Sequence, residues 1–206
     1  RFPKGATNGQ ELPGTAGTDR GAYGGVGLAG TTGGLKSMTI EGQNNFKIFQ
    51  PTDVDYAILP ILQASWHDLA SVIRLEKMCF SKDDAWSFLD HLAVLTLPGI
   101  FRKKFELEGE VIAFLAAEKQ EERKTAWITT IGVAPLHQHH GLARRLLADC
   151  EAGIGLPVVR LSVRRSNLGA IVLYRKTGYG QVDVWPRYYI GGEDALVFEK
   201  RLSRLS

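Results

Sequence analysis

Cysteine is scarce in this sequence, which contains only Cys79 and Cys150 among its 206 residues. Each lies among apolar residues in a helix-like pattern, so we expect both to be buried as free thiols in a reducing compartment. There is no Cys-x-x-Cys motif and no cluster of cysteine with histidine. The sequence therefore predicts neither a disulfide framework nor a metal site.

Long apolar runs and a strong net charge are also missing. No apolar run approaches the roughly 20 residues that a membrane-spanning helix needs. The formal net charge is only +3, which indicates scattered surface charge rather than a nucleic-acid groove. With 44% hydrophobic and 23% charged residues, the composition is typical of a soluble globular protein. We expect no membrane and no nucleic-acid partner.

The N-terminal stretch has a different composition from the rest of the chain. Residues 1–37 hold 11 of the 23 glycines, with few large apolar residues and no periodicity. Such a segment buries too little surface to offset the entropy of ordering, so it is predicted to be a disordered leader. Met38 is the first methionine and is interpreted as the natural start, with a transit peptide as the alternative. We expect a lead-in at 38–56 and a single domain at 57–206.

Hydrophobic periodicity in the remainder predicts the element order β-α-α-β-β-β-α-β-α-β-β. Strands at 100–106, 111–119 and 126–133 are joined by short turns and predict an antiparallel meander. A strand-helix-strand unit spanning 126–163 requires one parallel pair, so the class is a mixed α/β sheet. The other predicted elements are strands at 57–63, 158–163, 181–190 and 195–200, and helices at 69–78, from 83, from about 141, and from an Asn167 cap to 176.

The junction between the strand at 126–133 and the following helix carries a Gln138-x-x-Gly141-x-Ala143 pattern. The start of a helix presents unpaired N–H groups and the positive end of the dipole. Gly141 and Ala143 keep the approach free of bulk, and Arg144 and Arg145 add positive charge. The pattern therefore predicts a site for a phosphate, and a diphosphate would suit it better.

The pattern is short, and an ordinary strand-loop-helix connection is the alternative. Gly132 favours the functional interpretation, because glycine inside a strand often marks a bulge or a close approach to the backbone.

With its downstream segments the sequence resembles the GNAT superfamily of acetyl-CoA-dependent N-acetyltransferases, over about residues 57–202. The resemblance is carried by the Q-x-x-G-x-A loop at 138–143, by LSVRRSN at 161–167 with AIVLY at 170–174 and GY at 178–179, and by YY at 188–189 with EDAL at 193–196. Together with EKMCF at 76–80 and Trp86, these segments look like the branch that acetylates the N-terminal alanine of a small-subunit ribosomal protein.

The resemblance implies a mixed, mostly antiparallel sheet of about seven strands flanked by about four helices, with a splayed parallel pair at the cofactor site. It also implies a cytoplasmic enzyme that moves acetyl from acetyl-CoA to a primary amine in a ternary complex, without a metal. A protein N-terminus is the expected acceptor, and a small-molecule amine is the alternative. A non-catalytic acyl-CoA-binding module is the contrasting possibility.

The resemblance also implies roles for individual residues. The pantetheine arm would lie along Ile131, Gly132 and Val133, and Asn167 would hold the cofactor from the neighbouring strand. The pyrophosphate would sit in the loop at Gln138, His139, His140, Gly141, Leu142, Ala143 and Arg144. Tyr174 would donate a proton to the departing thiolate, since a phenol is protonated at pH 7. The alternative role for Tyr174 is that of an aromatic residue of the core.

One position departs from the branch, because Ser162 stands where a glutamate is the general base. A serine hydroxyl does not accept a proton near neutral pH. Either the base lies elsewhere or water carries the proton away. The candidates for the base are Glu76, Glu193, Asp194 and His137. For each of them the alternative is a solvated surface charge or loop residue. About a tenth of an α-amine is already neutral at pH 7, which favours an N-terminal acceptor over lysine.

Overall fold

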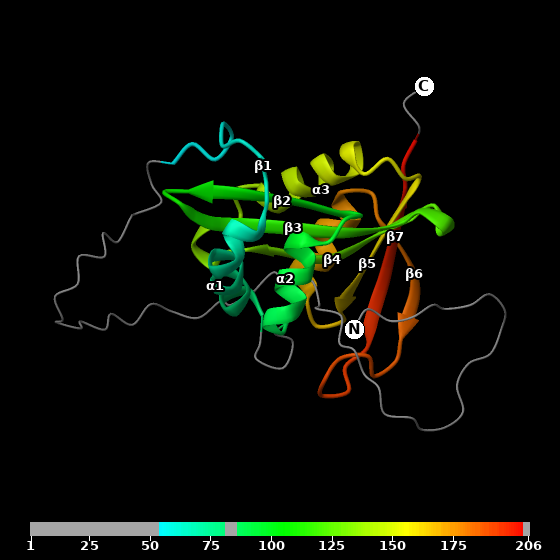
Figure 1. Cartoon of the computed structure of the whole chain (residues 1–206). Helices are drawn as coiled ribbons and strands as arrows, with labels where there is room; N and C mark the ends of the chain where they lie inside the picture. The colour runs from blue at the N-terminus through cyan, green and yellow to red at the C-terminus, as the bar shows by residue number, and fades with distance from the viewer. Residues whose placement is uncertain (1–53, 81–85, 204–206) are drawn as a thin grey trace.

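The computed structural model describes residues 54–80 and 86–203. In this part of the chain seven strands form one sheet in the order β1-β2-β3-β4-β5-β7-β6 (Figure 1). The strands β4 and β5 pair in parallel, and the other neighbouring pairs of this sheet are antiparallel. The mixed sheet predicted from the sequence is confirmed. The predictions for the leader at 1–37 and for most of the lead-in lie outside the described residues.

The elements have the following bounds. The strands are β1 (Leu62–Gln63), β2 (Ile100–Leu107), β3 (Glu110–Gln120), β4 (Thr125–Val133), β5 (Val158–Arg164), β6 (Gly180–Trp185) and β7 (Ala195–Arg201). The helices are α1 (Leu69–Cys79), α2 (Phe88–Thr96), α3 (Leu142–Gly153) and α4 (Leu168–Lys176), with short 3-10 turns η2 (Trp66–Asp68), η4 (Glu121–Arg123) and η5 (Pro135–His137).

The helices cover the two faces of the sheet in two groups. Apolar residues of α3 and α4, such as Leu146 and Ile171, are buried in one cluster with Ile131 of β4. Residues of α1 and α2, such as Leu75 and Val94, are buried in a second cluster with Phe114 of β3. Figure 1 shows α1 and α2 on the opposite side of the sheet from α3. The sheet therefore separates two layers of helices.

Local sequence explains most of the boundaries. Glu108 and Gly109 have φ values of 51° and 82°, the paired positive values of a tight hairpin turn between β2 and β3. The backbone N–H of Ser65 donates to Asp68 Oδ2 at 2.8 Å, in a capping box at the start of η2. Asn167 Oδ1 accepts from the N–H of Ala170 at 3.1 Å and caps α4 as predicted.

Three predicted boundaries are wrong. The strand predicted at 57–63 is limited to Leu62–Gln63, after Pro60, and it lies at the edge of the sheet. The helix predicted from residue 83 begins at Phe88, because the Ser87 hydroxyl accepts from the N–H of Asp90 and caps it there. The strand predicted at 181–190 ends at Trp185, because proline follows at position 186.

A bulge and a divergence shape the sheet at β4. In the pairing with β3, Ala116 faces Thr130 and Ala117 faces Ile128, so that Thr129 is an extra residue on β4. The parallel pairing of β4 with β5 runs from Thr125 only as far as Ile128, although β4 continues to Val133. The β5 side of Ile131 to Val133 is therefore open, which confirms the expected splayed pair.

Both cysteines are buried free thiols, as the sequence predicts. Within residues 54–80 and 86–203, no helix combines the length and the apolar character that crossing a membrane requires.

Candidate active site

A cleft of about 590 Å³ lies between the start of α3 and α4. It is lined by Val133 at the end of β4, by His137, Gln138, His139, His140, Gly141, Leu142, Ala143 and Arg144, and by Gly169, Val172 and Leu173 of α4. The cleft thus brings together Val133 and all seven predicted residues of the loop. The other predicted site residues, Ile131, Gly132, Asn167 and Tyr174, do not line it.

The backbone of the loop forms a cradle for an anion. His139 and Gly141 have φ values of 66° and 79°, whereas His140 between them does not have a positive φ. Alternation of this kind turns successive N–H groups toward one point, in the arrangement known as a nest. The first main-chain hydrogen bond of α3 runs from Arg145 N to Gly141 O at 3.0 Å, so the earlier N–H groups have no partner within the helix. A diphosphate fits this geometry and charge.

Side chains hold the loop in place. Gln138 Nε2 donates to Val133 O at 3.1 Å, which fastens the loop to the end of β4. Beneath the loop, the buried Tyr56 places its hydroxyl 2.8 Å from His137 Nδ1 and stacks on His140 at 4.0 Å. Burial and the nearby His140 hold the pKa of His137 below its usual value. His137 is therefore neutral at pH 7 and supports the loop through Tyr56.

The two arginines predicted at the phosphate site point to different places. Arg144 is exposed and lines the cleft, as predicted. Arg145 turns away and donates to Tyr56 O at 2.5 Å and Leu59 O at 2.6 Å, and its guanidinium lies 4.6 Å from the centre of the Phe105 ring. The prediction that Arg145 adds charge to the phosphate site is wrong, because this side chain holds the segment before β1 against the core.

The open edge of β4 has one carbonyl that is already occupied. Val133 O accepts from Gln138 Nε2 and also from Cys79 Sγ at 3.3 Å. A pantetheine arm would therefore use other main-chain groups of this edge. A Cβ at Gly132 would lie 3.3 Å from Cys79 Sγ, so the glycine accommodates the close approach of α1.

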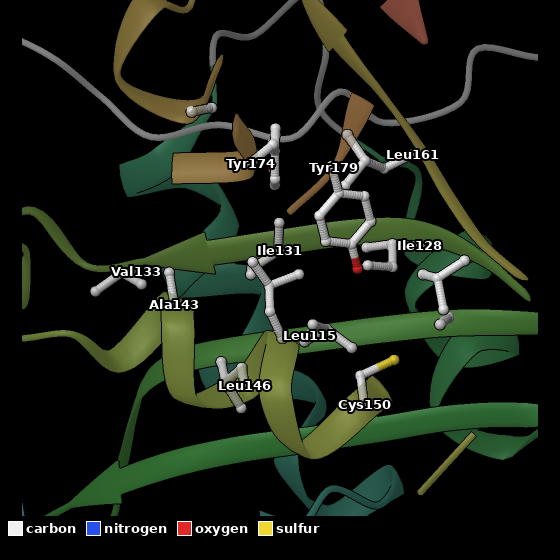
Figure 2. Packing of buried hydrophobic residues seen from close by; sticks show 14 of the residues in the cluster. Leu115, Ile128, Ile131, Val133, Ala143, Leu146, Cys150, Leu161, Tyr174 and Tyr179 are labelled. Carbon is white, nitrogen blue, oxygen red and sulfur yellow. The ribbon is translucent and has the colours of Figure 1, made fainter. Parts of the chain in front are cut away.

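Tyr174 projects from α4 into the core, near Tyr179 (Figure 2). It is fully buried, and within the described part of the chain its hydroxyl has no hydrogen-bond partner. Burial, with a smaller effect from Tyr189, raises the pKa of the Tyr174 phenol well above its usual value. An unpaired buried hydroxyl is costly, which is consistent with a hydroxyl that binds a ligand atom.

Two of the four candidate bases are structural. Glu193 binds Arg164 at 2.8 Å and accepts from the N–H of Ser166 at 2.6 Å. Burial opposes ionisation of Glu193, but these contacts outweigh it and keep its pKa below the usual value. Asp194 binds Arg165 at 3.2 Å. Both carboxylates therefore tie the loop between β6 and β7 to the end of β5.

Glu76 is the candidate that the structure places in a buried polar site. It lies near the end of α1 and contacts His91 Nε2 through Oε2, while Oε1 accepts from the N–H of Trp86 at 2.7 Å. A small cavity of about 20 Å³ is lined by this pair and by Val72, Leu75, Phe80, Trp86, Val94, Phe114, Thr130 and Gly132. His91 was not identified from the sequence, although its spacing from Val94 and Leu95 places it on the apolar face of α2.

The fold and site define an α/β protein with a cradle for an anion at a helix start, beside a splayed parallel strand pair. The model of the acetyltransferase (GNAT) family matches residues 64–179, and the chain belongs to this family. It is therefore an N-acetyltransferase enzyme with acetyl-CoA as its cosubstrate, as the sequence predicted.

Relatives and solved structures agree with this assignment. The chain is 31% identical over 150 residues to the N-terminal acetyltransferase A complex catalytic subunit NAA10 of Arabidopsis thaliana, covering 69% of this chain and 77% of the relative. It is 39% identical over 74 residues to N-alpha-acetyltransferase RimI of Mycobacterium tuberculosis, and the match covers 35% of this chain and 47% of that relative. The ribosomal-protein-S18-alanine N-acetyltransferase of Escherichia coli has a similar fold, with a TM-score of 0.64 at 24% identity over 71% of this chain and 96% of that one.

Proposed function

We propose that this enzyme acetylates the N-terminal α-amine of protein chains, with acetyl-CoA and the acceptor bound together. The observation that carries the proposal is the 31% identity over 77% of a relative that is the catalytic subunit of an N-terminal acetyltransferase. The site agrees with it, because Ser162 offers no carboxylate and an α-amine needs less help to lose a proton than a lysine does.

In this proposal the loop from Gln138 to Arg144 binds the pyrophosphate through its N–H groups, and the open edge at Ile131 to Val133 holds the pantetheine arm. Asn167 supports the cofactor from the end of β5. Acetyl-CoA supplies an acetyl thioester, and most of the acceleration comes from holding amine and thioester together.

Tyr174 is proposed to hydrogen-bond the departing sulfur and to protonate it. The raised pKa keeps the phenol protonated. A thiolate in the same buried site is also more basic than in water, because burial disfavours its charge, so the match between donor and acceptor is kept. The hydroxyl without a partner is the observation that supports this role.

We assign the reaction to the cytoplasm, because both buried cysteines are free thiols and such thiols are typical of reducing compartments. Detection of the protein in the cytosolic fraction of its source cells would test this, and recovery from an oxidising compartment would contradict it.

The test of the main proposal is a thiol-release assay with acetyl-CoA and a panel of acceptors. The panel holds peptides with free N-termini, the same peptides with blocked N-termini and one lysine, polyamines and aminoglycosides. We expect turnover that requires a free peptide N-terminus and whose product carries the acetyl group on the first residue. Turnover confined to the small amines would refute the protein acceptor.

A further inference from the structure

We propose that Glu76 and His91 form the proton-accepting pair for the acceptor amine, reached from the transfer point through the small cavity that both side chains line. The inference rests on the proposed function, because it requires an amine to be delivered to the β4 edge beside Gly132. It assigns the base that Ser162 does not provide.

The pair is a built polar site inside an apolar layer. The side chain of Glu76 is 10% exposed and that of His91 is 4% exposed. Glu76 Oε1 accepts from the N–H of Trp86 at 2.7 Å, while Oε2 meets His91 Nε2, and His91 Nδ1 lies 2.9 Å from Ser87 O. Buried charges of this kind are costly unless they are fully paired, so a pair kept here needs a reason.

The hydrogen bonds show how many protons the pair holds. The carbonyl of Ser87 only accepts, so His91 Nδ1 must carry a proton that it donates to Ser87 O. One further proton then lies between His91 Nε2 and Glu76 Oε2. The pair acts as a base once it has released this proton to solvent. Without the proton a nitrogen lone pair faces a carboxylate, which favours taking up a proton again.

The surroundings of the pair raise the pKa of His91. Burial alone lowers the pKa of His91, but the hydrogen bonds to Glu76 and Ser87 outweigh it, and the nearby charge of Asp90 adds to the rise above 6.5. Cys79, also on α1, has its pKa raised to about 12 by burial and stays a neutral thiol. The raised pKa of His91 brings this imidazole closer to an α-amine with a pKa near 8, which improves the match between proton donor and acceptor.

The cavity connects the pair to the place of reaction. Its wall includes Gly132 and Thr130 of β4 in addition to Glu76 and His91. Gly132 belongs to the strand edge proposed to hold the pantetheine arm, and the cavity lies on the α1 and α2 side of that edge. The cavity encloses about 20 Å³, the size of one water molecule, and Glu76 and Thr130 are polar residues of its wall.

The chemistry balances with this pair as the first proton acceptor. The acceptor ammonium gives one proton to the Glu76–His91 pair, directly or through one water, and becomes a neutral amine. The amine nitrogen then forms a C–N bond with the thioester carbonyl carbon, and the C–S bond breaks. The nitrogen's second proton passes to the phenolate that Tyr174 becomes when it protonates the departing sulfur, and the pair releases its proton to solvent.

The test is Glu76→Gln, which keeps the local structure. The amide oxygen still accepts from Trp86 N, and the amide NH2 still donates to a neutral His91, while the carboxylate is lost. We expect kcat/KM for an N-terminal peptide to fall at least about 100-fold at pH 7, with the Kd for CoA unchanged. The deficit should shrink as pH rises toward 9, because the amine then loses its proton unaided.

Glu110→Gln is the matched control. This glutamate also contacts α1, through Arg74 and Ser71, but it lies outside the cavity. Its pH profile should equal that of the wild type. A folded Glu76→Gln enzyme with wild-type kcat/KM and pH profile would overturn the pair's role while leaving acetylation of N-termini intact. A wild-type enzyme inactive on every peptide would instead refute the proposed function.

A measurement on the wild type decides the matter if Glu76→Gln does not fold. The ring nitrogens of His91, followed by nitrogen-15 NMR, should titrate over the same pH range as the rising limb of kcat. A His91 ring whose protonation stays constant from pH 6 to pH 9 would overturn the proposal.

Discussion

Replacement of Gly141 by valine tests the cofactor loop directly. Gly141 has a φ of 79° and precedes α3, and a Cβ there would meet nothing closer than Arg144 Nη2 at 4.0 Å. The protein itself therefore leaves room for a side chain, but a non-glycine residue in this conformation costs about 1–2 kcal/mol, and a β-branched one is disfavoured further. Gly141 also lines the cleft, so the added bulk would take up space there that we propose for the phosphates.

Gly141→Val should have two effects that can be measured separately, one on stability and one on CoA binding. Strain alone should lower Tm by about 2–4 °C for each kcal/mol lost. Loss of the cradle should weaken CoA binding at least tenfold, which corresponds to about 1.4 kcal/mol, as measured by titration calorimetry.

Gly155→Val is the matched control, because Gly155 follows α3 with a φ of 75° and lies outside the cleft. It should cost similar stability and leave the Kd for CoA unchanged. A folded Gly141→Val protein with wild-type CoA affinity would refute the assignment of the loop.

Three further results are expected. Tyr174→Phe keeps the ring and removes the hydroxyl without a partner, so turnover should fall by roughly 100-fold with CoA affinity intact, and unchanged turnover would discard the acid assignment. Ser162→Ala should change turnover far less, and an inactive but CoA-binding variant would show that the serine has a role in the reaction. Arg145→Ala loses two hydrogen bonds to carbonyls, so the free energy of unfolding should fall by about 1.5–3 kcal/mol while CoA affinity is preserved. Arg144→Ala should weaken CoA binding and preserve stability. The reverse pattern, measured by denaturation and calorimetry, would contradict these roles.

Features that depend on neighbouring residues could be predicted from the sequence. The hairpin at Glu108 and Gly109, the cap at Asn167 and the loop from Gln138 to Ala143 all follow from preferences within a few residues. The local backbone conformation of such patterns can be predicted from nearby residues, because turns, caps and helix starts form their hydrogen bonds within a few residues. The order of the elements and the parallel pair then followed from the spacing of strands and helices.

Features that depend on distant segments needed the fold. Arg144 and Arg145 are adjacent and equally charged in the sequence, yet contacts more than 80 residues away decide that only Arg144 faces the cleft. The pairing of Glu76 with His91 depends on how α1 packs against α2, which no local pattern specifies.

The sequence by itself determined the loop between β4 and α3, the class of sheet and the resemblance to acetyltransferases, because short-range preferences and motif order follow from the order of residues along the chain. Only the tertiary structure decided that the Tyr174 hydroxyl lacks a partner and that a buried carboxylate and imidazole share a cavity with Gly132. Burial and desolvation arise when separate elements pack together, and these change the acidity of a side chain far more than its neighbours in sequence do.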